Sequence, residues 1–561
     1  MRITRQNDGF AVIVAFASAV VVQAVLNQTS YVKTTMTLST AAQSLFDYSM
    51  QVSELRWDDY YKYVLYQEEG EYNTRFTAWY AVGLLARNQG EDVENAKAAI
   101  DNILRAQLTS DYNSAWYGTY KVALDEPEPT ETSSYWLPEI YTTYDPNWRE
   151  FVGTQLVQIA GLYSDLLGSS LIRRIEDALE KAAVGEMRRN GTYPPGDNLI
   201  LAYSNPSLMR CLTVGWIGAR RNNSAFIDFA NEKGRLLLEL FKLNGSNTLG
   251  EYNAPTYYGI DVWALAANIA YGSKNATMTT NAEYILAELW KDIAEHYNPY
   301  LRNMADPYDR AYTRDMTTHS AVLSLWWWAM FGRDYGGQPP LGDNDLMYDA
   351  TQGAAIALVS DIVLKYISID TAAALQAKGK WTGERFLKKT IRESLKRDIT
   401  RVATSWLSAE VMIGGMSLAE TVNRGEQFVP AIVHWASDPV KEPHLYVGFF
   451  SLYPSASTIT AVAGPNPLAL AYPNTTQSGT DIFTFAVSGI PPGWTLSGRR
   501  ITGLEDLPCL SVDVFAPGLI RLPVAASEVL LEDHYYYNVS FAVPKGFEGV
   551  PTVKMLFEYT C

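Results

Sequence analysis

From about residue 40 to about residue 400, apolar residues recur at helical spacing, and short polar loops separate the apolar segments. Apolar positions three and four residues apart predict amphipathic helices. The predicted helices are 40–52, 74–87, 93–108, 147–166, 171–189, 206–219, 225–242, 258–270, 281–296, 317–331, 349–366 and 384–399. A long run of helix pairs without an intervening sheet predicts an α/α toroid, or alternatively an α-solenoid. No repeat period is visible in the sequence, which favours the toroid.

After about residue 400 the pattern changes to short, alternating, β-branched segments separated by Pro and Gly. Such segments predict strands. The strand candidates are 406–417, 427–435, 482–487, 511–515, 535–543 and 552–559. The predicted fold class is therefore mainly α with a C-terminal β-domain: an (α/α) toroid over 25–400 and an antiparallel, sandwich-like β-domain over 401–561.

The N-terminus begins with basic residues, and an apolar run over 9–26 follows them, with the small residue Ala24 at a cleavage position. This pattern predicts a secretory signal peptide over 1–24, with a retained signal anchor as the alternative. Glycosylation sequons agree with export to the extracellular space, and they begin at Asn27, Asn190, Asn222, Asn244, Asn275, Asn474 and Asn538. We therefore expect a secreted glycoprotein without stable membrane insertion after cleavage.

The net charge excludes some classes of partner, and the cysteines and short motifs indicate which bonds and metal sites are possible. The net charge of −16 and the pI of about 4.9 argue against nucleic acid as a partner. Cys509 and Cys561 can pair in an oxidising compartment, whereas Cys211 lies in an apolar helix and is expected to be a buried thiol. Neither CxxC nor HExxH occurs, so a zinc site has no support in the sequence. Asp343, Asp345 and Asp349 could ligate calcium, but a solvated acidic turn is the favoured interpretation, and we predict no metal site and no cofactor.

Two polar, aromatic loops lead directly into apolar helices, which is a usual place for reacting groups. The first loop is interrupted by Pro255 and Gly259 and presents Glu251, Asn253, Tyr257 and Tyr258. The second loop precedes the segment 320–331 and carries Asp306, Arg310, Tyr312, Arg314, Asp315 and His319. Loops of this type, gathered at one end of a toroid, predict a substrate cleft.

A helical toroid followed by an all-β domain resembles the secreted polysaccharide lyases of the chondroitin AC, hyaluronate and xanthan lyase type, and the related glucuronan and alginate lyases. In those families an Asn at one helix mouth, a Tyr-Gly pair at the start of a later helix and a following Arg converge on a uronic acid. Tyr258-Gly259 is similar to the Tyr-Gly pair, and Arg310 or Arg314 follows it at a comparable separation.

Asn205, in Ser-Asn-Pro before a helix, is similar to the family Asn, and Asn198 is the rival. The His that these families place before the Tyr is absent, and Leu249, Glu251 and Asn253 occupy its neighbourhood. The resemblance implies an acidic polysaccharide as substrate and leaves the identity of the base open.

The implied β-elimination removes the proton α to a uronate carboxylate. An amide or a guanidinium must then offset the developing charge, and Asn205 and Asn253 are the candidates. Tyr258, or Tyr257 beside it, is the candidate base near Arg310 or Arg314, because a nearby cation favours the phenolate. His319 is an alternative base. The expected substrate contacts are Asn198, Glu251, Trp116, Tyr117, Trp148, Tyr312 and Asp315, with the loop aromatics stacking on sugar rings.

Other functions fit the same residues. An inverting glycoside hydrolase needs two separated carboxyl groups, which Glu251 together with Asp306 or Asp315 supplies. A non-catalytic glycan-binding surface protein would use the aromatic residues alone. The tyrosine pair can also be plain packing under a loop, and Arg310, Arg314 and Asp315 can be ion pairs that hold a loop.

Overall fold

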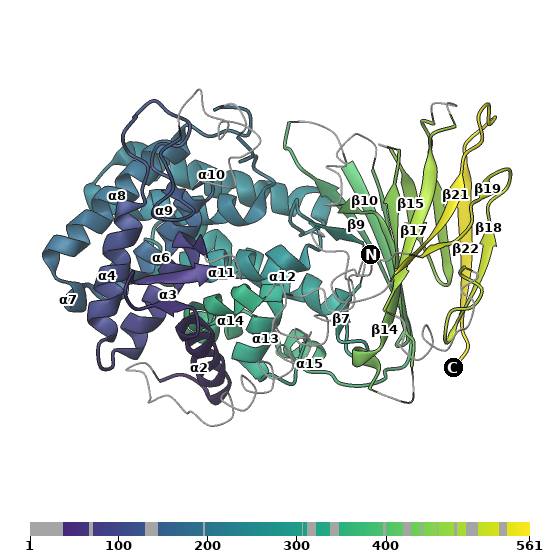
Figure 1. Cartoon of the computed structure of the whole chain (residues 1–561), viewed down its shortest axis with the longest axis horizontal. Coiled ribbons are helices and arrows are strands. Elements are labelled where there is room, and N and C mark those ends of the chain that lie inside the picture. The colour runs from purple at the N-terminus through teal and green to yellow at the C-terminus, as the bar shows by residue number, and fades with distance from the viewer. Residues whose placement is uncertain are drawn as a thin grey trace, which may run out of the picture. The chain divides into compact units, whose positions relative to one another are not determined.

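The computed structural model describes residues 37–66, 71–129, 144–194, 197–305, 307–310, 321–336, 347–396, 400–418, 428–438, 440, 442–456, 458–475, 479–489, 503–526 and 536–561. The chain divides into two compact units (Figure 1). The first comprises Met1–Gly185, Trp328–Arg333 and Pro339–Ser360, and the second comprises Glu186–Trp327, Asp334–Gln338 and Asp361–Cys561. The predicted signal segment and the sequon at Asn27 lie outside the described residues.

The first unit is built from helices whose ends follow from local sequence. Its helices are α2 (Thr40–Glu54), α3 (Thr74–Arg87), α4 (Asp92–Arg105), α6 (Trp148–Leu162), α7 (Ser164–Leu167) and most of α8 (Ser169–Met187), with η3 (Met347–Gln352) and the first part of α14 (Gly353–Leu364). At the start of α3 the Asn73 side chain accepts a hydrogen bond from the Phe76 amide at 3.1 Å. Asn88 ends the helix in the left-handed conformation, at φ 50°.

Short strands flank these helices. β1 (Trp57–Asp58), β2 (Tyr63–Tyr66) and β3 (Glu71–Tyr72) form one small antiparallel sheet, and β4 (Tyr120–Lys121) pairs with β5 (Tyr144–Asp145). The sequence pattern did not predict them, because segments of two to four residues are too short for an alternation to be recognised.

The second unit contains helices and both large sheets. Its helices are α9 (Ser204–Arg221), α10 (Ser224–Lys242), α11 (Pro255–Tyr271), α12 (Thr277–His296) and α15 (Ile369–Leu375), while α13 (Ala321–Phe331) is shared between the units. α11 and α13 approach closely at Gly259, where an added Cβ would lie 2.5 Å from the Leu323 nitrogen. The Gly259 carbonyl accepts a hydrogen bond from Trp326 Nε1 at 2.7 Å. The glycine of the Tyr-Gly pair is therefore required by helix packing.

The C-terminal part is a two-layer antiparallel β-domain (Figure 1). The larger sheet has the order β19-β21-β17-β14-β13-β11-β10-β9, with β20 also paired to β21, and the smaller has the order β15-β16-β22-β18. The bounds are β9 Arg385–Arg392, β10 Thr400–Leu407, β11 Val411–Ser417, β13 Ala431–Ala436, β14 Val447–Pro454, β15 Thr460–Ala463, β16 Pro467–Ala471, β17 Ile482–Ser488, β18 Leu510–Phe515, β19 Ile520–Arg521, β20 Ala525–Ala526, β21 Tyr537–Ala542 and β22 Thr552–Tyr559.

The two sheets enclose one apolar core. Its buried side chains come from both layers and include Ile413, Phe450 and Phe485 of the larger sheet and Leu470 and Met555 of the smaller one. Burial of alternate residues from both inner faces is the packing expected of a sandwich. The predicted fold class, helix pairs of toroid type followed by an antiparallel β-domain, is confirmed.

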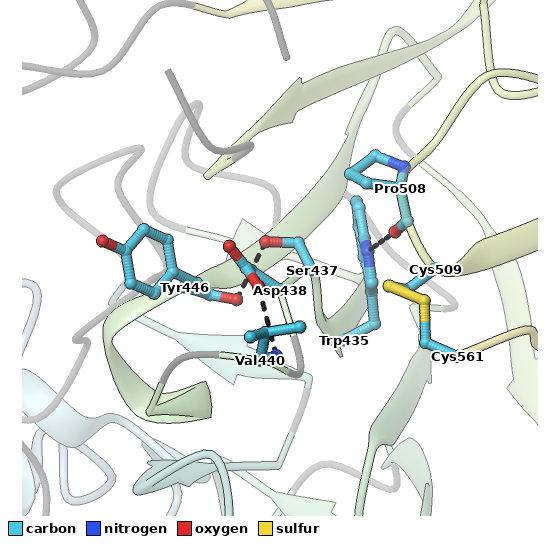
Figure 2. Close-up of a disulfide and its surroundings, with 8 residues drawn as sticks. All are labelled: Trp435, Ser437, Asp438, Val440, Tyr446, Pro508, Cys509 and Cys561. Atoms are coloured by element: carbon cyan, nitrogen blue, oxygen red, sulfur yellow. Dashed lines mark hydrogen bonds between the residues drawn. A yellow bond between two sulfur atoms is a disulfide. The ribbon is translucent and has the colours of Figure 1, made fainter. Parts of the chain in front are cut away.

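A disulfide joins Cys509 to Cys561 and confirms the predicted pairing (Figure 2). It lies beside the β18–β22 ladder, where the Thr560 amide donates to the Cys509 carbonyl at 3.0 Å. The Trp435 indole donates to the carbonyl of Pro508 at 2.8 Å, next to the disulfide. Cys211 is buried and unpaired, as predicted.

One predicted element is wrong. The segment 384–399 was expected to be helical because of its charged, amphipathic pattern, but Arg385–Arg392 forms strand β9 at the edge of the larger sheet. Its eight residues pair antiparallel with β10 along the whole strand, from Arg385↔Leu407 to Arg392↔Thr400. Tertiary pairing overrides local propensity here. Within the described residues, no helix has the length and apolar character needed to cross a bilayer.

Candidate functional site

The first of the two loops predicted to carry chemistry lies beside residues 307–310, the described part of the second loop. The Asp309 amide donates to the Tyr252 carbonyl at 3.1 Å, and Thr256 Oγ1 donates to the Arg310 carbonyl at 3.0 Å. The side-chain nitrogen Nδ2 of Asn253 donates to the carbonyls of Ala305 and Pro307. Both Asn253 (φ 47°) and Arg310 (φ 56°) adopt left-handed backbone conformations. These contacts fix the first loop against the segment that precedes Arg310.

A buried arginine from the β-domain holds both loops. Arg401 of β10 donates through Nη2 to the Gly250 carbonyl and through Nη1 to Asp309 Oδ2 at 3.1 Å. Its side chain is only 2% exposed, and Glu393 lies 3.3 Å from Nη2. Gly250 immediately precedes Glu251, and Asp309 Oδ1 in turn accepts a hydrogen bond from the Arg310 amide at 2.8 Å, so a single side chain supports the backbone next to both residues.

Arg310 and Glu251 form the polar centre of the site. Arg310 Nε donates to Glu251 Oε1 at 2.6 Å. Glu251 Oε2 accepts hydrogen bonds from the Ser204 amide at 2.9 Å and from Ser204 Oγ at 2.8 Å. Burial raises the pKa of Glu251 to about 7, although Arg310 lowers it. This carboxyl group is therefore poised to change protonation near neutral pH.

Two tyrosine rings lie beneath the Arg310 guanidinium. The Tyr203 and Tyr257 rings are stacked, with centroids 6.1 Å apart and planes 20° apart. The Arg310 Cζ atom lies 5.2 Å from the Tyr203 centroid and 5.7 Å from the Tyr257 centroid. Tyr257 is partly exposed, whereas Tyr203 is buried. The site therefore places a partly accessible phenol beside a fixed cation.

Tyr258, the residue predicted to transfer the proton, is placed unfavourably for that role. Its side chain is 1% exposed, and its hydroxyl accepts a hydrogen bond from the backbone amide of Asn253 at 2.7 Å. Burial raises the pKa of Tyr258 well above its usual value, and the charge of Asp292 raises it further. A buried phenol with a raised pKa is seldom ionised, so Tyr258 is a poor candidate for the base. The alternative predicted beside it, Tyr257, has the better environment.

The candidate asparagines differ in the use of their amide groups. The side-chain nitrogen of Asn253 donates to the carbonyls of Ala305 and Pro307, so this side chain holds the backbone of the neighbouring segment in place. Asn198 accepts a hydrogen bond from Arg189 Nη2 at 3.0 Å, and Arg189 also pairs with Glu186 and Asp197. Asn205 is 1% exposed, and its Oδ1 has no hydrogen-bond partner. Asn205 follows Ser204 directly, and within the described residues its amide oxygen accepts no hydrogen bond.

A second carboxyl group, Asp261 of α11, lies near Glu251. Asp261 is fully buried beside Ser204. Burial raises the pKa of Asp261 well above its usual value, the neighbouring Glu251 raises it further, and the Ser204 side chain lowers the pKa of this carboxyl group. Burial therefore favours the neutral form of Asp261 over the carboxylate.

The three predicted stacking aromatics belong to the first unit and are packed. Trp116, Tyr117 and Trp148 are 4%, 9% and 6% exposed. Trp116 contacts Tyr144 edge-on, with ring centroids 6.2 Å apart, in a small core that includes Leu108. Rings buried to this extent offer no open face to a sugar, so their expected stacking role is corrected to core packing.

Several candidates cannot be placed. Tyr312, Arg314, Asp315 and His319 lie outside the described residues, as does Asp306, one of the carboxyl groups considered for a hydrolase.

Sequence reasoning missed Tyr203, Ser204, Asp261 and Arg401. Tyr203 and Ser204 stand directly before the predicted Asn205, so the aromatic and hydroxyl residues of that loop were available signals. Asp261, an acidic residue inside an apolar helix, was a similar signal. Arg401 gave none, because its role depends on strand register and on loops more than ninety residues away in sequence.

Comparison with solved structures finds polysaccharide lyases. Chondroitin AC lyase of Streptomyces coelicolor A3 is 10% identical, with a TM-score of 0.36 over 96% of this chain and 82% of that one. Heparinase III is 12% identical, with a TM-score of 0.38 over 98% and 90%. A Paenibacillus xanthan lyase is 8% identical, with a TM-score of 0.35 over 97% and 60%. The resemblance to such lyases expected from the sequence is thus found among solved structures as well.

Comparison with curated proteins finds no matching sequence. Two family models do match the chain. The model described as a domain of unknown function, DUF8770, matches residues 383–558, which hold the β-domain. The model described as a domain of unknown function, DUF8769, matches residues 43–361, which is more than half of the chain. The chain therefore belongs to the DUF8769 family.

Proposed function

We propose that the protein is a secreted polysaccharide lyase that cleaves an acidic, uronate-containing glycan by β-elimination. The observation that carries this proposal is the partly exposed phenol of Tyr257 beneath the guanidinium of Arg310. A guanidinium beside a phenol favours loss of the phenolic proton and attracts an anionic substrate to the same place. This combination suits abstraction of a proton next to a carboxylate.

In the proposed reaction, the Tyr257 phenolate removes the proton α to the uronate carboxylate. The electron pair of the broken C–H bond forms the new double bond, and the bond to the 4-linked oxygen breaks. Tyr257 then returns the proton to that leaving oxygen. Negative charge builds up on the carboxylate during this step, and Arg310 together with the Asn205 amide would offset it.

Glu251 has a positioning role in this proposal. Its carboxylate accepts from Arg310 Nε on one side and from Ser204 on the other, so it fixes the guanidinium over the two rings. Because burial raises the pKa of Glu251 to about 7, the ion pair with Arg310 is fully formed only above neutral pH. We expect lyase activity to rise with pH through this range.

A screen of anionic and neutral polysaccharides tests the proposal. Products are read in two ways, by the ultraviolet absorbance of an unsaturated uronate and by the appearance of reducing ends. A lyase gives both signals on a uronate polymer. New reducing ends without absorbance would indicate a glycoside hydrolase instead, and retention on a glycan without any product would indicate a binding protein.

A further inference from the structure

A cluster of cations that form no salt bridge with the described carboxylates lies away from the Glu251 cluster, on and beside α9 and α10. It consists of Arg210 of α9 and Lys233 of α10, and Lys396, which follows strand β9, adds a positive charge that acts on Lys233. Arg210 Cζ lies 5.6 Å from the Phe229 ring centroid, and Lys233 Nζ lies 5.2 Å from the same centroid. Both cations therefore contact one aromatic ring. The cluster belongs wholly to the second unit.

Arg210 is the unusual member of this cluster. Its side chain is 1% exposed, and neither Nε nor Nη1 has a hydrogen-bond partner among the described residues. A guanidinium stays charged at every physiological pH, so it cannot escape burial by losing its proton. The contact with Phe229 offsets only part of this cost. A buried group without a partner in a native structure calls for an ion, a water molecule or a ligand.

The surrounding charges add to the need for an anion. Burial lowers the pKa of Lys233, the charge of Arg210 lowers it further, Glu232 acts in the opposite direction, and Lys396 adds a smaller lowering. Within the described residues, no carboxylate forms a salt bridge with any of the three, although the whole chain carries a net charge of −16. Lys233 is partly exposed and Lys396 is exposed, so the cluster extends from the interior to solvent.

We infer that Arg210, Lys233 and Lys396 form a binding site for an oxyanion, a carboxylate or sulfate group. Guanidinium nitrogens bind two oxygens of such a group side by side, and the lysines supply point charges around it. An oxyanion would satisfy the buried nitrogens of Arg210 and relieve the repulsion among the cations. The inference does not depend on the proposed lyase activity, because the site requires only an anion.

Titration calorimetry tests this site directly. Wild-type protein in a chloride buffer is titrated with sodium sulfate, sodium phosphate or sodium glucuronate at constant ionic strength. We expect saturable binding of at least one of these anions, and the preferred anion separates a carboxylate ligand from a sulfate or phosphate ligand. Absence of saturable binding for all three would overturn the inference.

Variants assign the binding to the cluster. Arg210→Met should weaken binding at least tenfold, and Lys233→Met and Lys396→Met severalfold each, because each removes one charge. Lys291→Met removes an exposed charge from α12 in the same unit and should bind as the wild type does. If Arg210→Met does not fold, the two lysine variants decide the question. Unchanged binding in both of them would place the anion elsewhere and contradict the inference.

Discussion

Two adjacent tyrosines at the start of α11 have opposite environments. Successive residues on a helix point about 100° apart, so a helix that packs one ring into the interior turns the next toward the loop. Tyr258 is buried against the Asn253 amide, whereas Tyr257 lies under Arg310. The sequence showed that a tyrosine belongs at this helix mouth, but choosing between the two required the direction of each side chain.

Tyr258 should matter for stability. Tyr258→Phe removes the oxygen that accepts the Asn253 amide and leaves a buried N–H without a partner. Such a group costs about 1–3 kcal/mol. We expect urea unfolding to show a loss of that size with turnover reduced only slightly. A variant of wild-type stability would contradict the structural role assigned to this hydroxyl.

Glu251 should make stability depend on pH. Its pKa rises from 4.5 in the unfolded chain to about 7 in the folded protein, so the folded state binds the proton more tightly. Its contribution to stability is therefore present below about pH 4.5 and is lost as the pH rises through about 7. The shift corresponds to roughly 3 kcal/mol, since each pKa unit is about 1.4 kcal/mol.

Glu251→Gln removes this titration while keeping the shape of the side chain. Urea midpoints measured between pH 5 and pH 8 should fall less steeply for the variant than for the wild type. Titrating groups away from Glu251, such as Asp349, whose pKa burial raises to about 6, contribute equally to both proteins and cancel in the comparison. Parallel curves for the two proteins would show that Glu251 does not titrate in this range.

At the scale of elements, periodicity predicted most of the fold. The predicted helix 74–87 coincides with α3, and the predicted strand 552–559 coincides with β22, because both carry their full pattern locally. The prediction of a helix over 384–399 was wrong because β9 pairs with β10. Strand pairing is a non-local interaction that a local pattern does not record. The hydrogen bonds from Arg401 to Gly250 and Asp309 could not be predicted for the same reason.

Substitution of Arg401, a residue of the β-domain, should lower kcat. Arg401→Met removes the donors to Gly250 and Asp309, so the backbone next to Glu251 and Arg310 loses its support. Small displacements of catalytic groups reduce rates strongly, and we expect kcat to fall roughly 10²-fold. Arg401→Lys keeps the charge and should recover part of the rate.

Arg385 of the neighbouring strand β9 provides the matched control. It donates to the carbonyls of Ala294, Glu295 and Tyr297 at the end of α12, and it forms no hydrogen bond with the described residues of either loop. Arg385→Met should therefore lower stability without a comparable loss of kcat. An equal loss of kcat in the two methionine variants would mean that Arg401 acts only through general stability.

At the scale of the whole molecule, the predicted export can be tested through the sequons. Asn190, Asn222, Asn244, Asn275 and Asn474 are exposed. Asn538 instead lies inside strand β21, paired with Ala486 and Ala525, and is only partly exposed. Loops accept glycans more readily than strands inside a sheet.

Expression in a glycosylating host should give a secreted product whose mobility on a gel increases after glycosidase treatment. Asn474→Gln should reduce that change, and Asn538→Gln should leave it unaltered, because only the first sequon is open at the surface. An unglycosylated product retained in the cytosol would contradict both the signal peptide and the extracellular location proposed from the sequence.

The site as a whole was predicted in outline. Glu251, Arg310, Asn205 and Tyr257 were candidates from the sequence, and all of them lie in one unit with Tyr203 and Ser204 between them. The sequence could not reveal which amides are already used by backbone carbonyls, nor which aromatic rings are buried. Both depend on tertiary packing, as Asn253 and Trp116 demonstrate.

The central claim is that Tyr257, and not Tyr258, transfers the proton in a β-elimination. The most direct test compares Tyr257→Phe with Tyr258→Phe by the absorbance of unsaturated uronate, on a polymer that the wild type cleaves. Tyr257→Phe should lower kcat roughly 10²- to 10⁴-fold while substrate affinity and stability stay near those of the wild type, because only a positioned base is lost. Full activity of Tyr257→Phe, or a greater loss of kcat in Tyr258→Phe, would contradict this account.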